Sequence, residues 1–82
     1  MKANVIIIDP KKREIDYTSH ETDLENIRKS LDCKFIEMIY LFSYPNVTVI
    51  CDEEGRLKNN DKKYYVRLGE HIFVNKIMLV NL

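Results

Sequence analysis

Residues 20–33, HETDLENIRKSLDC, contain the pattern from which the fold can be worked out. Three apolar residues recur there at helical spacing, with charged residues between them: Leu24, Ile27 and Leu31. This pattern predicts a short amphipathic helix over residues 23–31. Thr22 and Glu25 fit a capping box at its start. Because a helix this short is marginal alone, its single apolar stripe predicts that it packs against a sheet.

The chain before the helix predicts two strands. NVIII, residues 4–8, is apolar on both alternating faces, which is typical of a strand buried on two sides. REIDYT, residues 13–18, alternates apolar and polar residues, as a half-buried strand does. Asp9-Pro10 ends the first strand and begins a turn. The two strands are therefore expected to form a hairpin.

The chain after the helix predicts a second hairpin and a last strand. Residues 35–43 and 47–51 are strand-like and are separated by the turn residues Tyr44-Pro45-Asn46. Residues 59–69 are compatible with a loop that contains one helical turn, or with an irregular strand. HIFVNKIMLVNL, from residue 71, predicts a strand that continues to Val80. The order β-β-α-β-β-loop-β predicts an α+β fold, with a single mostly antiparallel sheet of about five strands and one helix packed on one face.

Length and charge limit the classes of protein that fit. With 82 residues, the chain is expected to form a single small α+β domain over residues 1–82. Lys plus Arg total 13 and Asp plus Glu total 13, which argues against general binding to nucleic acid or to membrane surfaces. MKANVIIIDP is too short in its apolar part for a signal peptide. No apolar run approaches the about 18 residues of a membrane span. A cytoplasmic location with reduced thiols is expected.

The acidic run Asp52-Glu53-Glu54-Gly55 raises the question of a metal loop. A calcium loop places its oxygen ligands at alternate positions, whereas these acids are consecutive. The run is therefore predicted to be a bend, in which Gly55 supplies a positive φ. Four residues are potential zinc ligands, but none is paired at metal-site spacing: His20, Cys33, Cys51 and His71.

The chain contains no nucleophile–base pair or phosphate-binding motif that would define a reaction. His20 is expected to be a solvated neighbour of the helix cap, and His71, beside Glu70, a surface histidine. The expectation is a protein that is not an enzyme, with no catalytic residues, no metal and no cofactor.

The segment from residue 56 to residue 67 is the strongest candidate for a ligand site. Basic, amide and tyrosine side chains alternate in it: Arg56, Lys58, Asn59, Asn60, Lys62, Lys63, Tyr64, Tyr65 and Arg67. Basic groups can neutralise phosphate, and tyrosine rings offer a stacking surface to a base. The alternative interpretation is a solvated loop whose tyrosines pack partly onto the sheet.

Several segments together resemble one protein family. MKANVIIIDPKKREIDY, FIEMIYL, VTVICDEEGRLK and IFVNKIMLV resemble, in order and spacing, the family known as domain of unknown function 3846. That family consists of small proteins found largely in phages and other mobile or viral genomes. The chain departs from the family pattern at Val74-Asn75, where a glycine is usual. The resemblance implies a small, non-enzymatic, phage- or virus-type accessory protein.

Two modes of binding follow as hypotheses. In the first, an exposed sheet edge or apolar sheet face docks a host protein and inhibits it, as an antagonist of host defence would. In the second, the protein self-associates and sequesters a phosphate-bearing small ligand, such as a signalling nucleotide, with the segment 56–67. A homo-oligomer is expected because one helix cannot cover both faces of a five-stranded sheet.

Overall fold

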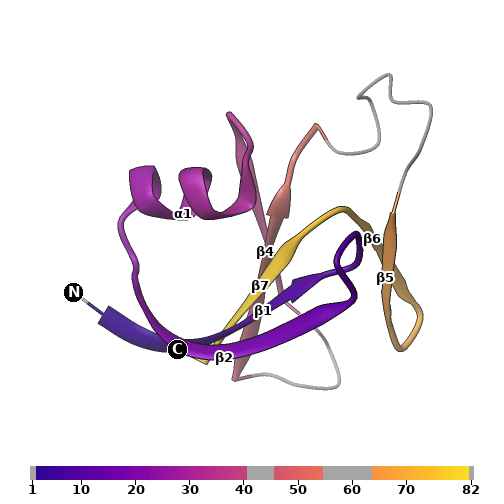
Figure 1. Ribbon diagram of the computed structural model, residues 1–82, viewed down its shortest axis with the longest axis horizontal. Helices are drawn as coiled ribbons and strands as arrows, with labels where there is room; N and C mark the ends of the chain where they lie inside the picture. The colour runs from indigo at the N-terminus through magenta and orange to yellow at the C-terminus, as the bar shows by residue number, and fades with distance from the viewer. Residues whose placement is uncertain (1, 41–45, 55–63, 82) are drawn as a thin grey trace.

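A computed structural model describes residues 2–40, 46–54 and 64–81 of the protein, and it describes side chains up to residue 80. The elements in chain order are β1 (Lys2–Asp9), β2 (Glu14–Glu21), α1 (Leu24–Leu31), β3 (Ile36–Tyr40), β4 (Val47–Asp52), β5 (Tyr65–Leu68), β6 (His71–Val74) and β7 (Ile77–Asn81). Five strands form an antiparallel sheet in the order β2-β1-β7-β4-β3, and β5 pairs with β6 in a small second sheet (Figure 1). The predicted α+β class is confirmed.

The central strand of the large sheet is β7, which comes last in the chain. It pairs with β1 on one side and with β4 on the other, so that Leu79 lies between Ile6 and Val49. Both predicted hairpins are confirmed, since β1 pairs with β2 and β3 pairs with β4. Met78 and Val80 belong to one buried cluster and Ile77 to another, so β7 is covered on both faces, which accounts for its apolar composition.

Helix α1 covers one face of this sheet, as its apolar stripe predicts. Ile27 and Leu31 are buried there in one cluster with residues of three strands: Val5, Ile50, Met78 and Val80. Leu24 is half exposed and lies outside the buried cluster. The predicted capping box is wrong by one residue, because the N-cap is Asp23, whose carboxylate accepts a hydrogen bond from the Asn26 backbone N–H.

The predicted final strand is in fact two strands in two different sheets. Asn75 breaks the run with a φ of 68°, a conformation that asparagine tolerates better than most residues with side chains. The family resemblance leads one to expect a glycine at Val74-Asn75, and glycine adopts a positive φ even more readily than asparagine. The chain before the break forms β6, and the chain after it forms β7.

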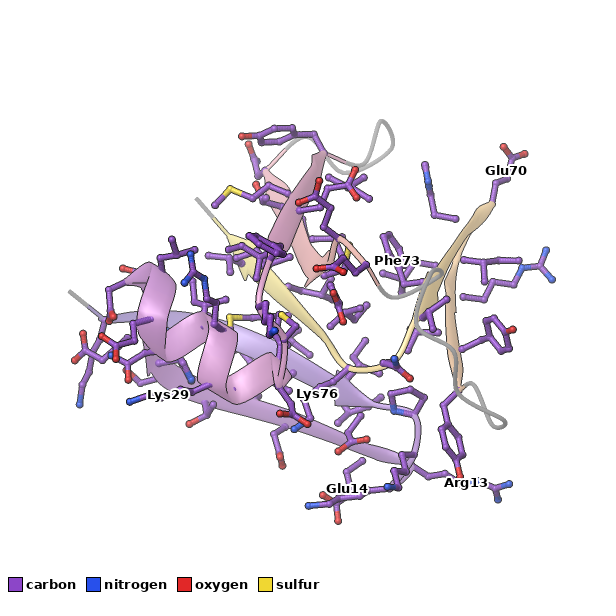
Figure 2. All side chains as sticks on the ribbon, turned by 90° about the horizontal axis from the view of Figure 1, so that it is seen from above. Arg13, Glu14, Lys29, Glu70, Phe73 and Lys76 are labelled. Atoms are coloured by element: carbon purple, nitrogen blue, oxygen red, sulfur yellow. The ribbon has the colours of Figure 1, made fainter. Side chains whose placement is uncertain are left out.

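The β5–β6 hairpin covers part of the second face of the large sheet. Gly69, with a φ of 60°, provides the first residue of its tight turn. A second buried cluster joins the hairpin to the sheet: Val49, Cys51, Val66, Phe73 and Ile77. Figures 1 and 2 show α1 and this hairpin on opposite sides of the sheet, with Phe73 directed inward. The fold is therefore a sheet between a helix and a hairpin.

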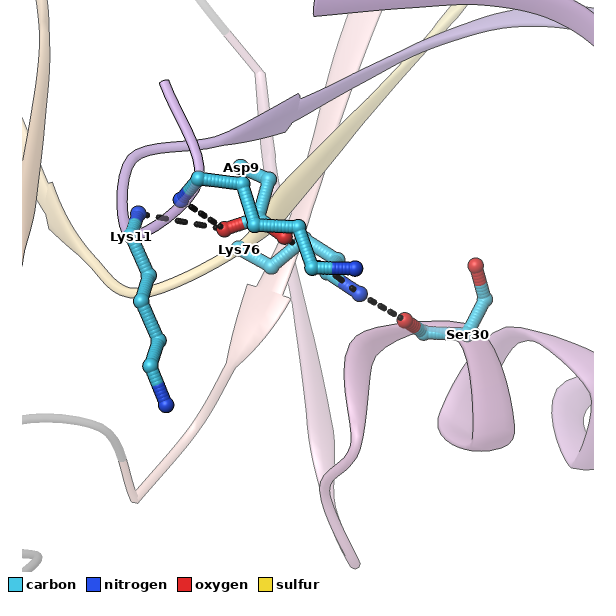
Figure 3. Close-up of polar contacts among 5 residues, drawn as sticks. Asp9, Lys11, Ser30 and Lys76 are labelled. Atoms are coloured by element: carbon cyan, nitrogen blue, oxygen red, sulfur yellow. Dashed lines mark hydrogen bonds and ion pairs between the residues drawn. The ribbon is translucent and has the colours of Figure 1, made fainter. Parts of the chain in front are cut away.

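Lys76 ties three segments together at one end of this arrangement (Figure 3). Its Nζ donates a hydrogen bond to the Ser30 carbonyl at 3.1 Å, near the C-terminus of α1, and lies 3.9 Å from Asp9 Oδ2. The other carboxylate oxygen of Asp9 accepts from the backbone N–H groups of Lys11 and Lys12, which closes the β1–β2 turn. The last carbonyls of a helix lack partners within the helix, so a cation there is favourable.

Candidate functional site

The hairpin and the large sheet enclose a cleft of about 320 Å³ between them. Strand β3 contributes Glu37 and Ile39, strand β4 contributes Cys51 and Asp52, and Glu53 follows directly. The hairpin closes the opposite wall with its turn residue and with β6: Glu70, His71, Ile72, Phe73 and Val74. The cleft therefore joins segments that are far apart in the chain.

The base of the cleft is formed by largely buried apolar residues, whereas its exposed lining is mainly polar and its rim is acidic. Cys51 and Phe73 are buried in the cluster that joins the hairpin to the sheet, and Ile39 packs against that cluster. Glu37, Glu53 and Glu70 are exposed around it, and Figure 2 shows Glu70 at the tip of the hairpin. Among the described residues that line the cleft, none is a lysine or an arginine. The described residues therefore give the lining of the cleft a net negative charge.

Asp52 has a structural role at the edge of this cleft. It is buried, and its Oδ1 accepts a hydrogen bond of 2.9 Å from the Glu54 backbone N–H. Residues 53 and 54 form a turn after β4, as predicted for the acidic run, while Gly55 lies outside the described residues. Glu54 lines a different concavity, next to Arg28 and Lys34, so the consecutive acids separate as their spacing predicts.

The two histidines do not come together. His20 lies on β2, and its Nδ1 is 2.6 Å from the Glu21 carbonyl oxygen. His71 lies at the cleft, where its ring stacks on Phe73 with 6.2 Å between the ring centroids. Cys33 follows α1, and the Cys51 thiol donates to the Glu37 carbonyl at 3.7 Å. Within the ranges that the structure describes, no three such side chains are grouped to hold a metal ion.

Most of the predicted phosphate-binding segment lies outside the described residues, including Arg56, Lys58, Asn59, Asn60, Lys62 and Lys63. Three of its members are described. Tyr65 and Arg67 are exposed on β5, and the Arg67 Nε donates to the Gly69 carbonyl at 3.0 Å. Tyr64 precedes the strand, and its carbonyl accepts from the Asn75 N–H at 2.7 Å. In this part, Arg67 supports the hairpin turn.

Sequence reasoning missed the cleft because its walls meet only in the folded chain. One signal was present in the sequence: Glu37 is the only charged residue within the apolar strand IEMIY. In a strand that is otherwise suited to burial, such a residue marks a face that remains open to solvent or to a ligand.

In the described residues, these features define an α+β protein with an antiparallel sheet, a helix, and a hairpin that forms one wall of an acidic cleft. In the described part of the chain, no helix is long and apolar enough to cross a membrane. The chain belongs to the family described as domain of unknown function (DUF3846), whose model matches residues 1–82. Neither a curated protein nor a solved structure matches the chain.

Proposed function

We propose that the protein is a non-enzymatic binding module, and that its cleft receives a cationic side chain of a partner protein. The observation that carries the proposal is the combination of an apolar base with three exposed carboxylates: Glu37, Glu53 and Glu70. Lysine and arginine have long apolar stems that end in a charged head. In this proposal, the stem lies along the apolar residues that line the cleft and the head pairs with the carboxylates of the rim.

The size and charge of the cleft favour one side chain over a whole cofactor. A volume of about 320 Å³ is at the small end of ligand pockets, which span roughly 300–1,000 Å³. Arginine suits the site better than lysine, because its planar guanidinium pairs with carboxylates through two parallel hydrogen bonds. A phosphate group would meet the repulsion of the acidic rim.

The family resemblance supports a particular setting for this binding. It implies an accessory protein of a phage or virus, so the partner in this proposal is a protein of the host cell, which binding would inhibit. The alternative, a phosphate-bearing small ligand bound by an oligomer, requires the segment 56–67 instead of the cleft. The two functions therefore predict different sets of damaging substitutions.

A peptide titration tests the proposal. The probe is a blocked hexapeptide with one central arginine between threonine and valine residues, and its binding is followed by isothermal titration calorimetry. The control peptide carries citrulline, a neutral analogue of arginine, at the same position. The proposal predicts that the arginine peptide binds and that the citrulline peptide does not. Equal binding of the two peptides would exclude the acidic rim as the determinant.

Variants then locate the binding site. Glu37→Gln and Glu70→Gln should each weaken binding by up to about fivefold, which corresponds to an exposed ion pair of about 1 kcal/mol. Glu14→Gln, at an exposed acid on β2 away from the cleft, is the matched control and should leave binding unchanged. A response to ATP that is lost in Lys62→Glu or Lys63→Glu, with no response to the arginine peptide, would favour the alternative function.

A further inference from the structure

Strand β3 is an edge of the large sheet, and the direction of its backbone groups can be worked out. Within the described ranges, it pairs with β4 alone. The Phe35 carbonyl accepts from the Glu53 N–H at 3.0 Å, and the Glu37 carbonyl faces the Cys51 thiol. Because these groups alternate along an antiparallel strand, the N–H and C=O groups of the intervening residues point away from β4. Those residues are Ile36, Met38 and Tyr40.

The side chains on this edge suit pairing with another strand. Met38 is 51% exposed and Tyr40 is 68% exposed, and neither carries a charge. The single charge of β3, on Glu37, lies on the opposite face, at the cleft. By contrast, the other edge strand, β2, carries three acids: Glu14, Asp16 and Glu21. Charges of this kind protect a sheet edge from further pairing, and the outward-facing residues of β3, Ile36, Met38 and Tyr40, carry none.

We infer that β3 is the self-association edge of this protein, where two copies join their sheets about a two-fold axis at Met38. With Met38 opposite Met38, Ile36 of each copy lies opposite Tyr40 of the other, and all five residues of the strand are paired. Each of these outward pairs exchanges two backbone hydrogen bonds. Glu37 then lies opposite Ile39, so that no like charges face each other directly.

The partner at this edge is a second copy of the chain, because the outward-facing residues of β3 are complementary to the same residues of a strand that runs in the opposite direction. An isologous two-fold interface brings the same patch of both subunits together. Ile36, Met38 and Tyr40, read against the same strand in reverse, place apolar residues opposite one another at every outward position. The inference does not depend on what the cleft binds. It places the two clefts on the same face of one continuous sheet.

Sedimentation over a wide range of protein concentrations tests the inference. The wild-type protein should show a monomer–dimer equilibrium. Met38→Lys should weaken it by at least about tenfold, because two lysines would then face each other across the axis. Ile15→Lys, at a residue 71% exposed on β2, is the matched control and should leave the equilibrium unchanged. A monomer at every concentration, or a dimer lost only in Ile15→Lys, would overturn the inference.

Amide hydrogen exchange on the wild-type protein gives an independent readout that does not depend on a variant that folds. On dimerisation, the amides of Ile36, Met38 and Tyr40 should become protected. Those of Glu37 and Ile39, which point towards β4, should be protected at every concentration. An alternating gain of this kind supports strand pairing at β3. A dimer in which these three amides exchange as fast as in the monomer would contradict it.

Discussion

Replacing Lys76 with methionine removes a charge and keeps most of the apolar stem. In the folded protein the Lys76 ammonium donates to the Ser30 carbonyl at 3.1 Å and lies 3.9 Å from Asp9 Oδ2. The two side chains are only 31% and 15% exposed, so solvent screens this pair less than it screens a surface pair. Lys76→Met should therefore destabilise the protein measurably.

The size of the loss follows from these contacts. A hydrogen bond from a charged donor contributes about 1.5–3 kcal/mol to stability. The partial exposure of Lys76 places the expected loss near the middle of this range, at about 2 kcal/mol. For a domain of this size, that loss lowers the Tm by roughly 8–16 °C. Thermal unfolding followed by circular dichroism measures the change.

Lys29→Met is the matched control. Lys29 Nζ lies 3.5 Å from Glu25 Oε1 on the surface of α1, and both side chains are more than 70% exposed. Such a pair contributes only about 0.3–0.5 kcal/mol, and salt screens it. The effect of Lys76→Met should be several times larger and should persist in high salt. Equal effects of the two substitutions would refute the conclusion that Lys76 ties the helix end to the turn.

Three further predictions concern the core, the strand break and the helix cap. Ile77→Ala, at a side chain with no exposed surface, should lower the free energy of unfolding, measured with urea, by about 2–5 kcal/mol. Ile15→Ala, at an exposed side chain, should have little effect. Similar losses in the two variants would contradict the assigned core. Asn75→Gly should leave the stability nearly unchanged, because glycine adopts a positive φ without strain. Asn75→Val should lose about 1–2 kcal/mol of stability, because a valine at this φ is strained. The reverse order of thermal stability would refute this explanation. Hydrogen bonds from the Asn26 side chain and then from its backbone N–H hold the pKa of Asp23 below its ordinary value. The stabilisation that this carboxylate provides is therefore complete above its ordinary pKa and is lost as the pH falls through the lower, folded-state pKa. Asp23→Ala should lower the Tm at neutral pH and have less effect in strong acid, and a Tm difference that does not change with pH would contradict the cap.

The helix and both long hairpins could be predicted because each depends on local signals. The apolar stripe of Ile27 and Leu31 requires a surface to pack on, and the turn residues after Asp9 connect two strand-like runs. The exact cap could not be predicted with the same security. Thr22 and Asp23 are both favourable N-cap residues, one position apart, and the fold uses Asp23.

The division of the last run could not be read from its pattern. In one continuous strand, Asn75 and Lys76 would simply point to opposite faces, and only the positive φ of Asn75 shows that the chain turns there. This turn is what forms β6 and folds the hairpin over the sheet. The predicted fold had one helix over an otherwise uncovered sheet and therefore lacked the cover on the second face.

The cleft could not be predicted from the sequence either, because it exists only once the hairpin is folded over the sheet. Glu37 and Glu70 are 33 residues apart in the sequence, and only the position of the hairpin brings them to the same rim of the cleft. The segment 56–67 attracted attention because its basic residues and tyrosines are contiguous. Local composition identifies contiguous sites well, but it does not identify sites that are assembled from separate strands.

The most direct test of the central claim is a nuclear Overhauser measurement on the complex with the arginine hexapeptide. If the cleft receives the cationic side chain, the arginine methylene protons will show contacts with the Phe73 ring and the Ile39 methyl groups. Contacts of these methylenes with α1 or with the outer face of β5 alone would contradict the account.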